Sequence, residues 1–295
     1  ILDFYTCTEC GRCSDNCPAY IADKKLSPKH LSLALRNHVY NTEKAMFGGT
    51  TPGEAESKSE AKEEDKSGEP RVLHTFPLAP EGGYFESDTP VELVPNILHP
   101  DVVWGCTTCR ACEEQCPVMI SYVDKIVGIR RDQMMMKNEF PHTLQGAFNG
   151  IETNGNPWNI HSSERGKWSD GLDVPMLSDK PDAAVLYWVG CAASYDDDSK
   201  KVARAVSKLL TKAGVDFAVL GSEETCTGDP ARRAGNEYLF QMMAQQNVET
   251  LNGYGCDKKT IITACPHCFN TLLNEYPDFG GKYDVVHHTD FLNGL

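Results

Sequence analysis

The spacing of apolar and polar residues changes near residue 181. Beyond it, short apolar runs alternate with longer stretches in which apolar residues recur every three or four positions. The first kind of run is typical of strands and the second of amphipathic helices. Strands are expected at 183–189, 216–220, 260–263 and 283–286, and helices at 200–213, 236–251 and 266–276. This alternation predicts a doubly wound, mainly parallel α/β domain over residues 181–295.

The helix at 200–213 shows the clearest stripe. Its core face is expected to carry Val202, Val206, Leu209, Leu210 and Ala213. Gly214 follows directly, where a glycine commonly ends a helix in the left-handed conformation.

The first part of the chain shows helical spacing without strands. Leu31, Leu35 and Val39 form one stripe, and Tyr122 and Ile126 begin a second. We therefore expect an α-helical domain over 1–137.

Three segments between these elements are expected to lack regular structure. Residues 48–70 are rich in Gly, Ser, Thr, Glu and Lys and contain no aromatic residue, which predicts a disordered insert. Residues 71–100 are dense in Pro and Gly, which favours an irregular surface loop. Residues 138–180 are interpreted as a connecting arm between the two domains.

Cysteine is the most informative residue type in these 295 residues. Ten of the 13 cysteines fall in three tight groups, and the others are Cys191, Cys226 and Cys256. Small secreted domains spread their cysteines over disulfide-linked loops, whereas tight groups indicate metal ligands in a reducing compartment.

Two of the groups are copies of one motif. The segments CTECGRCSDNCP and CTTCRACEEQCP share the spacing C-x2-C-x2-C-x3-C-P, which is typical of bacterial ferredoxins with two [4Fe-4S] clusters. In that arrangement the fourth cysteine of each motif binds the other cluster. The first cluster is then expected on Cys7, Cys10, Cys13 and Cys116, and the second on Cys17, Cys106, Cys109 and Cys112.

A pair of zinc sites is the alternative interpretation of C-x2-C pairs. Zinc requires four ligands for each site. It does not explain why each motif has a third evenly spaced cysteine and a fourth cysteine before proline, or why this spacing occurs twice. Iron and sulfur are therefore favoured.

Four further cysteines follow the expected strands. Cys191 follows the first strand, Cys226 the second, and Cys265 and Cys268 the third. Ligand sites in open parallel sheets lie at the carboxyl ends of the strands, so these thiols are expected to converge. Cys256 has no partner pattern and receives no role.

The residues around these cysteines resemble a known domain. The runs GCAAS, TCTGDPARRAGNEYLFQ and TACPHCFNTLLNEYP are similar to the cysteine-rich CCG domain of heterodisulfide reductases and of the iron–sulfur subunits of lactate, glycolate and anaerobic glycerol-3-phosphate dehydrogenases. Together with YTCTECGRC, they resemble most closely the membrane-bound electron-transfer-flavoprotein:menaquinone oxidoreductase family.

This resemblance implies an iron–sulfur oxidoreductase that relays electrons from electron-transfer flavoprotein toward a membrane quinone. It implies a haem b-containing cytochrome-type membrane domain outside this chain, and a position at the cytoplasmic side of the cell membrane. Ile1 as first residue fits a soluble piece cut from a longer polypeptide. The alternatives are a heterodisulfide reductase-like catalytic subunit and an iron–sulfur subunit of one of the dehydrogenases named above.

One departure from the CCG pattern bears on the alternatives. Thr227 follows Cys226, where the name-giving motif has a second adjacent cysteine. The resemblance implies a non-cubane, disulfide-cleaving cluster where five cysteines are present. With four, namely Cys191, Cys226, Cys265 and Cys268, an ordinary third [4Fe-4S] cluster and electron relay are favoured.

Charge and missing motifs exclude other classes. The net charge is −14, from 28 basic and 42 acidic residues, so nucleic acid is not an expected partner. No phosphate-binding glycine motif marks a flavin or nucleotide site, and no catalytic triad or carboxylate pair is evident. Arg232, Arg233 and His267 either have a function, raising the potential of the third site by positive charge or docking an acidic flavoprotein, or are solvated charges at a helix start.

Overall fold

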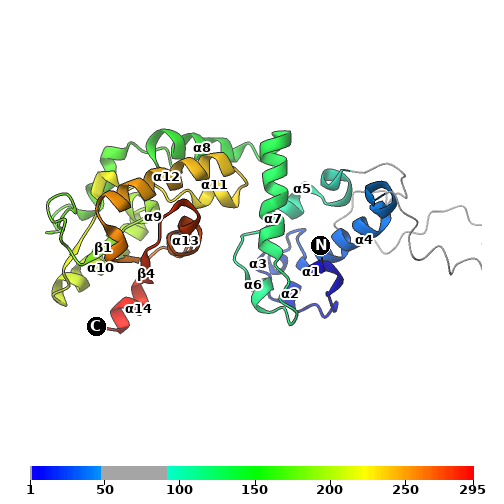
Figure 1. Cartoon of the computed structure of the whole chain (residues 1–295), viewed down its shortest axis with the longest axis horizontal. Coiled ribbons are helices and arrows are strands. Elements are labelled where there is room, and N and C mark those ends of the chain that lie inside the picture. The colour runs from blue at the N-terminus through cyan, green and yellow to red at the C-terminus, as the bar shows by residue number, and fades with distance from the viewer. Residues whose placement is uncertain (1, 48–91) are drawn as a thin grey trace, which may run out of the picture. The chain divides into compact units, whose positions relative to one another are not determined.

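The computed structural model describes residues 2–47 and 92–295, and divides the chain into two compact units at Arg130 and Arg131 (Figure 1). The expected insert at 48–70 and residues 71–91 of the expected loop lie outside the described residues. We describe each unit by itself.

The first unit is helical, as the sequence predicts. Its elements are α1 (Leu2–Tyr5), α2 (Arg12–Asp15), α3 (Pro18–Ile21), α4 (Pro28–Phe47), η1 (Leu93–Ile97), α5 (Pro100–Trp104), α6 (Ala111–Glu114) and α7 (Tyr122–Arg131). The short helices α2 and α6, one from each cysteine motif, contact each other. Leu31 from α4 and Ile126 from α7 are buried in one core with several of the cysteines.

One segment of the first unit differs from the expectation of an irregular surface loop. Leu93–Ile97 forms a helical turn, and Val94, Ile97 and Leu98 are buried in the core. Most prolines and glycines of residues 71–100 precede this turn. The apolar residues of the turn itself pack inward.

The second unit contains a parallel sheet of four strands, β1 (Val185–Trp188), β2 (Phe217–Ala218), β3 (Thr260–Thr263) and β4 (Asp284–His287). The strand order is β2-β1-β3-β4, and Val185 pairs with Phe217 on one side and Thr260 on the other. All four residues of β1 are buried, so both faces of the sheet are covered. The predicted fold class is therefore confirmed: a helical unit precedes an α/β unit with a parallel sheet.

Helices connect and cover the strands of this sheet. They are α9 (Cys191–Tyr195), α10 (Asp197–Lys212), α11 (Asp229–Arg233), α12 (Glu237–Gly253), α13 (Pro266–Asn270) and α14 (His288–Asn293), with shorter turns η4 (Gly221–Glu223), η5 (Cys256–Lys258), η6 (Thr271–Glu275) and η7 (Tyr276–Phe279). The side chains of Asp196 and Asn236 cap α10 and α12 by accepting hydrogen bonds from backbone amides of their first turns.

The core face of α10 differs from the predicted stripe. Val206 and Leu210 are buried, but Val202 and Leu209 are about half exposed and Ala213 is exposed. Ala203 and Ser207 are buried instead, so the inward face is rotated by one position around the helix. The predicted and the observed faces lie side by side on the helix and share Val206 and Leu210, so the pattern of hydrophobic residues alone did not distinguish them.

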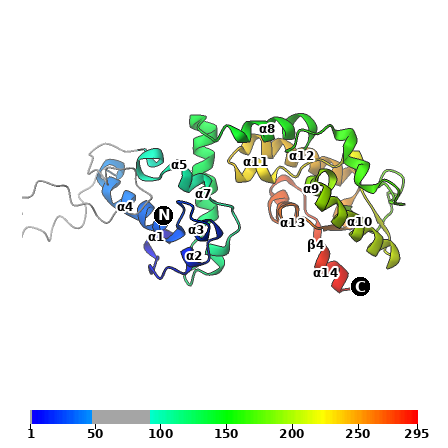
Figure 2. The same ribbon diagram turned by 180° about the vertical axis from the view of Figure 1, so that it is seen from behind.

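The segment expected as an arm with little regular structure also folds. It contains α8 (Thr143–Asn154) and η3 (Ser162–Ser169), after η2 (Asp132–Lys137). In both views α8 runs beside α11 and α12 (Figures 1 and 2). Trp168 of η3 is buried against Tyr187 of β1, so this segment belongs to the core of the second unit.

Candidate iron–sulfur sites

The two cysteine motifs adopt the same loop. In the first motif Glu9 and Gly11 have positive φ, and in the second Thr108 and Arg110 occupy the equivalent positions with positive φ. These residues flank the exposed middle cysteine of each motif and turn the chain sharply around it. Arg110 adopts this conformation without glycine's freedom, and its guanidinium bonds Glu113 at 2.6 Å and Asp124 at 2.9 Å.

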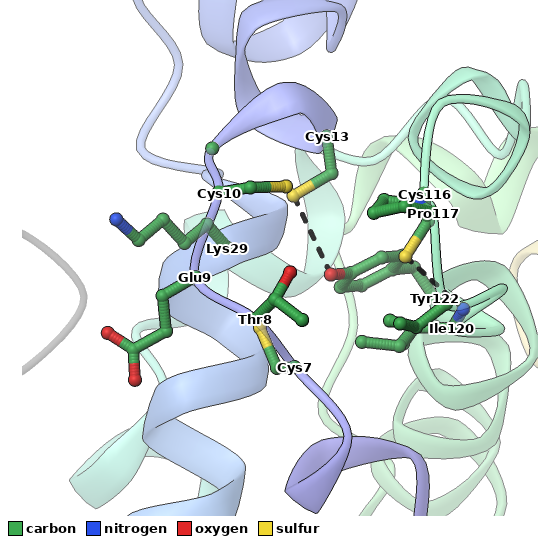
Figure 3. A pocket seen from close by; sticks show the side chains of 12 residues that line it. Cys7, Thr8, Glu9, Cys10, Cys13, Lys29, Cys116, Pro117, Ile120 and Tyr122 are labelled. Atoms are coloured by element: carbon green, nitrogen blue, oxygen red, sulfur yellow. Dashed lines mark hydrogen bonds between the residues drawn. The ribbon is translucent and has the colours of Figure 1, made fainter.

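The first cavity joins the two motifs. It encloses about 270 Å³, including the solvent at its mouth, and four cysteines line it: Cys7, Cys10, Cys13 and Cys116. Three come from the first motif and one from the second, as the crossed assignment predicts. Figure 3 shows these side chains around the space, with Ile120 and Tyr122 closing one side.

The second cavity has the reciprocal lining. It encloses about 360 Å³, again with open solvent, and its cysteines are Cys17, Cys106, Cys109 and Cys112. Apolar side chains, among them Leu26, Leu31 and Ile126, form the rest of the wall. Tyr122 lines both cavities and therefore lies between them.

Hydrogen-bond donors face several of these sulfurs. The Tyr122 hydroxyl donates to Cys13 Sγ at 3.6 Å, the Thr108 amide to Cys106 Sγ at 3.3 Å, and the Ile120 amide to Cys116 Sγ at 3.5 Å. Donors of this kind stabilise negative charge on sulfur and set the potential of a bound cluster.

Burial works against the thiolate forms in the protein alone. Desolvation raises the pKa of Cys13 and Cys106, and that of Cys112 to about 12. Metal binding to such thiols must therefore release protons, and its free energy also stabilises the fold. The arrangement fits a [4Fe-4S] cluster in each cavity, since four thiols surround a space with apolar walls.

Four of the five remaining thiols meet at the carboxyl edge of the sheet. Cys191 is the first residue of α9 after β1, and Cys265 caps α13 after β3. The strand order reverses between β1 and β3, which is where ligands bind in open parallel sheets. Cys226 Sγ lies 3.9 Å from Cys191 Sγ, and a Cβ on Gly190 would come within 3.3 Å of Cys268 Sγ.

Two features fix the loops of this third group. Gly190 has φ +82° and a carbon added to it would press on Cys268, so only glycine fits there. The buried Asn247 donates to the Cys226 carbonyl at 2.9 Å and to the Tyr276 hydroxyl at 3.0 Å. It also accepts a hydrogen bond from Thr225 at 2.9 Å.

Local hydrogen bonds lower the pKa of two thiols in the third group, Cys265 and Cys191, and raise the pKa of their partners, Cys268 and Cys226. The pKa of Cys265 is lowered to about 6, first by the hydrogen bond with Cys268 and further by the amides of Cys268 and His267. The pKa of Cys191 is lowered by its hydrogen bond with Cys226, in spite of desolvation. The Thr227 hydroxyl lies 4.0 Å from Cys268 Sγ, beside the thiols. Four thiols, two of them biased toward thiolate, fit a third cluster.

The structure shows a buried ion pair here that the sequence did not indicate. Arg165 Nη2 donates to Glu224 Oε1 at 2.7 Å, and both side chains are almost fully buried. Burial opposes the charge, but the Glu224 carboxylate raises the pKa of Arg165 above its usual range. Arg165 lies in a polar stretch without a motif, so only the fold connects it with Glu224.

Arg232, Arg233 and His267, for which the sequence left two interpretations, are joined in one network. The carboxylate of Asp229 accepts from His267 Nδ1 at 2.9 Å and from Arg233 Nε at 3.0 Å. Glu275 pairs with both arginines. Because Asp229 is buried and both arginines are mostly covered, the two arginines are not solvated charges at a helix start, whereas the His267 side chain is exposed.

Cys256 lies apart from this site. Its side chain is fully buried, and desolvation raises its pKa to about 11. Within residues 2–47 and 92–295, no three His, Cys, Asp or Glu side chains form a tight site for a single metal ion.

Comparison with known families assigns a domain family to each of two segments of the chain. Residues 3–120 match the 4Fe-4S dicluster domain, and residues 185–273 match the cysteine-rich CCG domain. The chain is therefore a 4Fe-4S dicluster domain followed by a CCG domain, which confirms the family resemblance predicted from the cysteine motifs.

Several similar proteins are named as oxidoreductases or reductases. EtfAB:quinone oxidoreductase of Syntrophomonas wolfei is 38% identical over 303 residues, which cover all of this chain and 40% of that protein. The probable iron-sulfur-binding oxidoreductase FadF of Bacillus subtilis is also 38% identical, with 42% of its length covered. One subunit of the dihydromethanophenazine:CoB–CoM heterodisulfide reductase of Methanosarcina barkeri is 29% identical, with 64% covered.

The chain spans about two fifths of the length of the first two relatives. No solved structure matches it significantly. Within the described residues, none of the helices combines the length and apolar character needed to cross a membrane.

Proposed function

We propose that this chain is the iron–sulfur electron-transfer part of a quinone-reducing oxidoreductase and holds three [4Fe-4S] clusters. The supporting observation is the reciprocal lining of the two cavities. Each takes three cysteines from one motif and the fourth from the other, although the motifs lie almost a hundred residues apart. A two-cluster ferredoxin requires this arrangement.

When bound, the clusters supply one-electron chemistry. The chain contributes thiolates from Cys7, Cys10, Cys13 and Cys116 for one cluster, Cys17, Cys106, Cys109 and Cys112 for the next, and Cys191, Cys226, Cys265 and Cys268 for the third. Apolar walls restrict water, and the N–H and O–H donors described above favour negative charge on sulfur.

The partners follow from the relatives. One relative has electron-transfer flavoprotein and quinone in its name. In this proposal, the flavoprotein and the quinone are separate from this chain. We propose electron-transfer flavoprotein as the donor and a membrane quinone as the final acceptor, reached through a haem b-containing membrane domain. The site of action is then the cytoplasmic side of the membrane.

Iron analysis of anaerobically prepared protein, with reduction by electron-transfer flavoprotein, tests this proposal. We expect about twelve irons a chain, from four irons in each cluster. Reduced flavoprotein should bleach the cluster absorbance. About eight irons would refute the third cluster, and stoichiometric zinc in a colourless protein would refute all three.

The second candidate function is heterodisulfide reduction, favoured by the similarity to the heterodisulfide reductase of Methanosarcina barkeri. It predicts turnover of the CoB–CoM heterodisulfide at the third site by the isolated protein. The electron-relay proposal predicts no turnover. A heterodisulfide reductase assay on the anaerobically prepared protein therefore distinguishes the two functions.

A further inference from the structure

The ion pair of Arg165 and Glu224 is built into the loop that carries Cys191. The Glu224 carboxylate accepts three hydrogen bonds: from Arg165 at 2.7 Å, from the Val189 amide at 2.9 Å and from the Gly190 amide at 2.8 Å. The two amides directly precede Cys191. Glu224 therefore fixes the start of the loop that presents this thiol.

Arg165 bonds the Glu224 carboxylate, but not all of its N–H donors have an acceptor. Its Nε is buried and finds no acceptor among the residues that the structure describes. Its guanidinium carbon lies 5.8 Å from the ring centre of Tyr195, in the short helix that begins at Cys191. A desolvated cation with a free donor thus lies beside the third group of thiols.

Both charges lie close to the loop that presents Cys191. The Glu224 carboxylate bonds the two amides that precede this residue, and the Arg165 guanidinium bonds that carboxylate and lies against the ring of Tyr195. Both charged side chains are almost fully buried, so the field of each charge at this thiol passes through little water. In a water-poor environment such a field is weakly screened.

We infer that Arg165 and Glu224 are positioning residues of the third site, and that the fixed charge of Arg165 raises its reduction potential while Glu224 lowers it. This inference rests on the proposed function, because it requires a cluster on Cys191, Cys226, Cys265 and Cys268. Reduction adds one electron, and hence one negative charge, from the flavoprotein donor or from dithionite in vitro. A nearby cation stabilises that charge and a nearby carboxylate opposes it.

Redox titration of the full chain, followed by electron paramagnetic resonance, tests the two charges separately. Arg165→Gln should shift the potential of the third cluster to more negative values. Glu224→Gln removes the negative charge but retains one oxygen acceptor, for one of the two loop amides, and should shift the potential to more positive values. The Cys226→Ala variant identifies the signal of the third cluster, and the other two potentials serve as internal references.

Arg204→Gln is the matched control, because Arg204 is an arginine that holds η3 from another side, by donating to the Trp168 and Asp170 carbonyls, and bonds none of the residues of the third site. We expect the third potential to remain unchanged in this variant. Opposite shifts in the two test variants, with about twelve irons in each, support the inference.

Equal potentials in Arg165→Gln and the unaltered protein, or shifts of the same sign in both test variants, would overturn the inference. If Arg165→Gln loses the third cluster, Arg165→Lys decides. A retained cluster with a near-normal potential supports a role of charge, whereas its loss in that variant shows a structural role only. About eight irons in the unaltered protein would instead refute the third cluster itself.

Discussion

The hydroxyl of Tyr122 donates a hydrogen bond to Sγ of Cys13 at 3.6 Å (Figure 3). Tyr122 is buried, and its side chain lines both cysteine cavities of the first unit. Its hydroxyl, however, bonds a sulfur of the first cavity. One residue therefore separates the two proposed clusters and favours negative charge at one of them.

Tyr122→Phe should lower the reduction potential of the first cluster and leave that of the second nearly unchanged. The substitution removes the donor but retains the ring, so iron content should stay the same. A hydrogen bond worth about 1 kcal/mol more in the reduced state corresponds to a shift of roughly 40 mV for one electron. Redox titration with electron paramagnetic resonance measures the shift.

Tyr5→Phe is a suitable control, because Tyr5 is partly exposed and its ring contacts Tyr40. It should change neither potential. Unchanged potentials in Tyr122→Phe would show that the bond to Cys13 contributes equally in both redox states.

Paired cysteine substitutions distinguish crossed from uncrossed ligation. Cys10 and Cys116 line the same cavity, whereas Cys17 lines the other. Cys10→Ala with Cys116→Ala should therefore remove only one cluster and leave about eight irons, while Cys10→Ala with Cys17→Ala should remove two and leave about four. Uncrossed ligation predicts the reverse. Iron analysis and Mössbauer spectroscopy give the counts.

The sequence predicted which cysteines lie together better than it predicted their surroundings. Motif spacing is local, so the crossed grouping of Cys17 and Cys116 followed from two short segments. The third group followed from strand periodicity, because β3 occupies the predicted residues and β1 lies within its predicted range. The carboxyl ends of parallel strands meet at one edge of the sheet, and this brought the thiols together.

What the sequence could not predict depends on contacts between distant segments. Arg165 and Glu224 are 59 positions apart and carry no motif. The packing of α8 and η3 within the second unit overrode a polar, glycine-rich composition. The inward face of α10 packs against α9 and η3 and shares their core cluster, and local hydrophobicity does not encode these contacts.

Asn247 is predicted to be important for stability around Cys226. Asn247→Leu leaves the Cys226 carbonyl and the Thr225 hydroxyl without their partner. A buried unsatisfied polar group costs about 1–3 kcal/mol, so we expect the free energy of unfolding to fall by about 2–4 kcal/mol. Gln245→Leu, on the exposed side of the same helix, should change it by about 0.5 kcal/mol or less. Chemical denaturation under anaerobic conditions makes the comparison.

Cys256 should be protected by burial and the other twelve cysteines by their clusters. We expect iodoacetamide to modify none of the 13 in the loaded protein. Removing iron with a chelator should expose the ligand cysteines to the reagent, whereas Cys256 should react only after denaturation, since its side chain is fully buried. Peptide mass spectrometry assigns the sites, and alkylation of Cys256 in the loaded protein would contradict its placement.

The same burial predicts a pH dependence of stability. Desolvation raises the pKa of Cys256 from about 9 to about 11, so between these values the folded chain keeps a proton that the unfolded chain releases. Its stabilising contribution is present in full below pH 9 and is lost as the pH rises to 11. Over this window the free energy of unfolding should fall faster than in Cys256→Ala, by up to about 1.4 kcal/mol for each pH unit. Parallel slopes for the two proteins in denaturation series would show that this thiol ionises equally in both states.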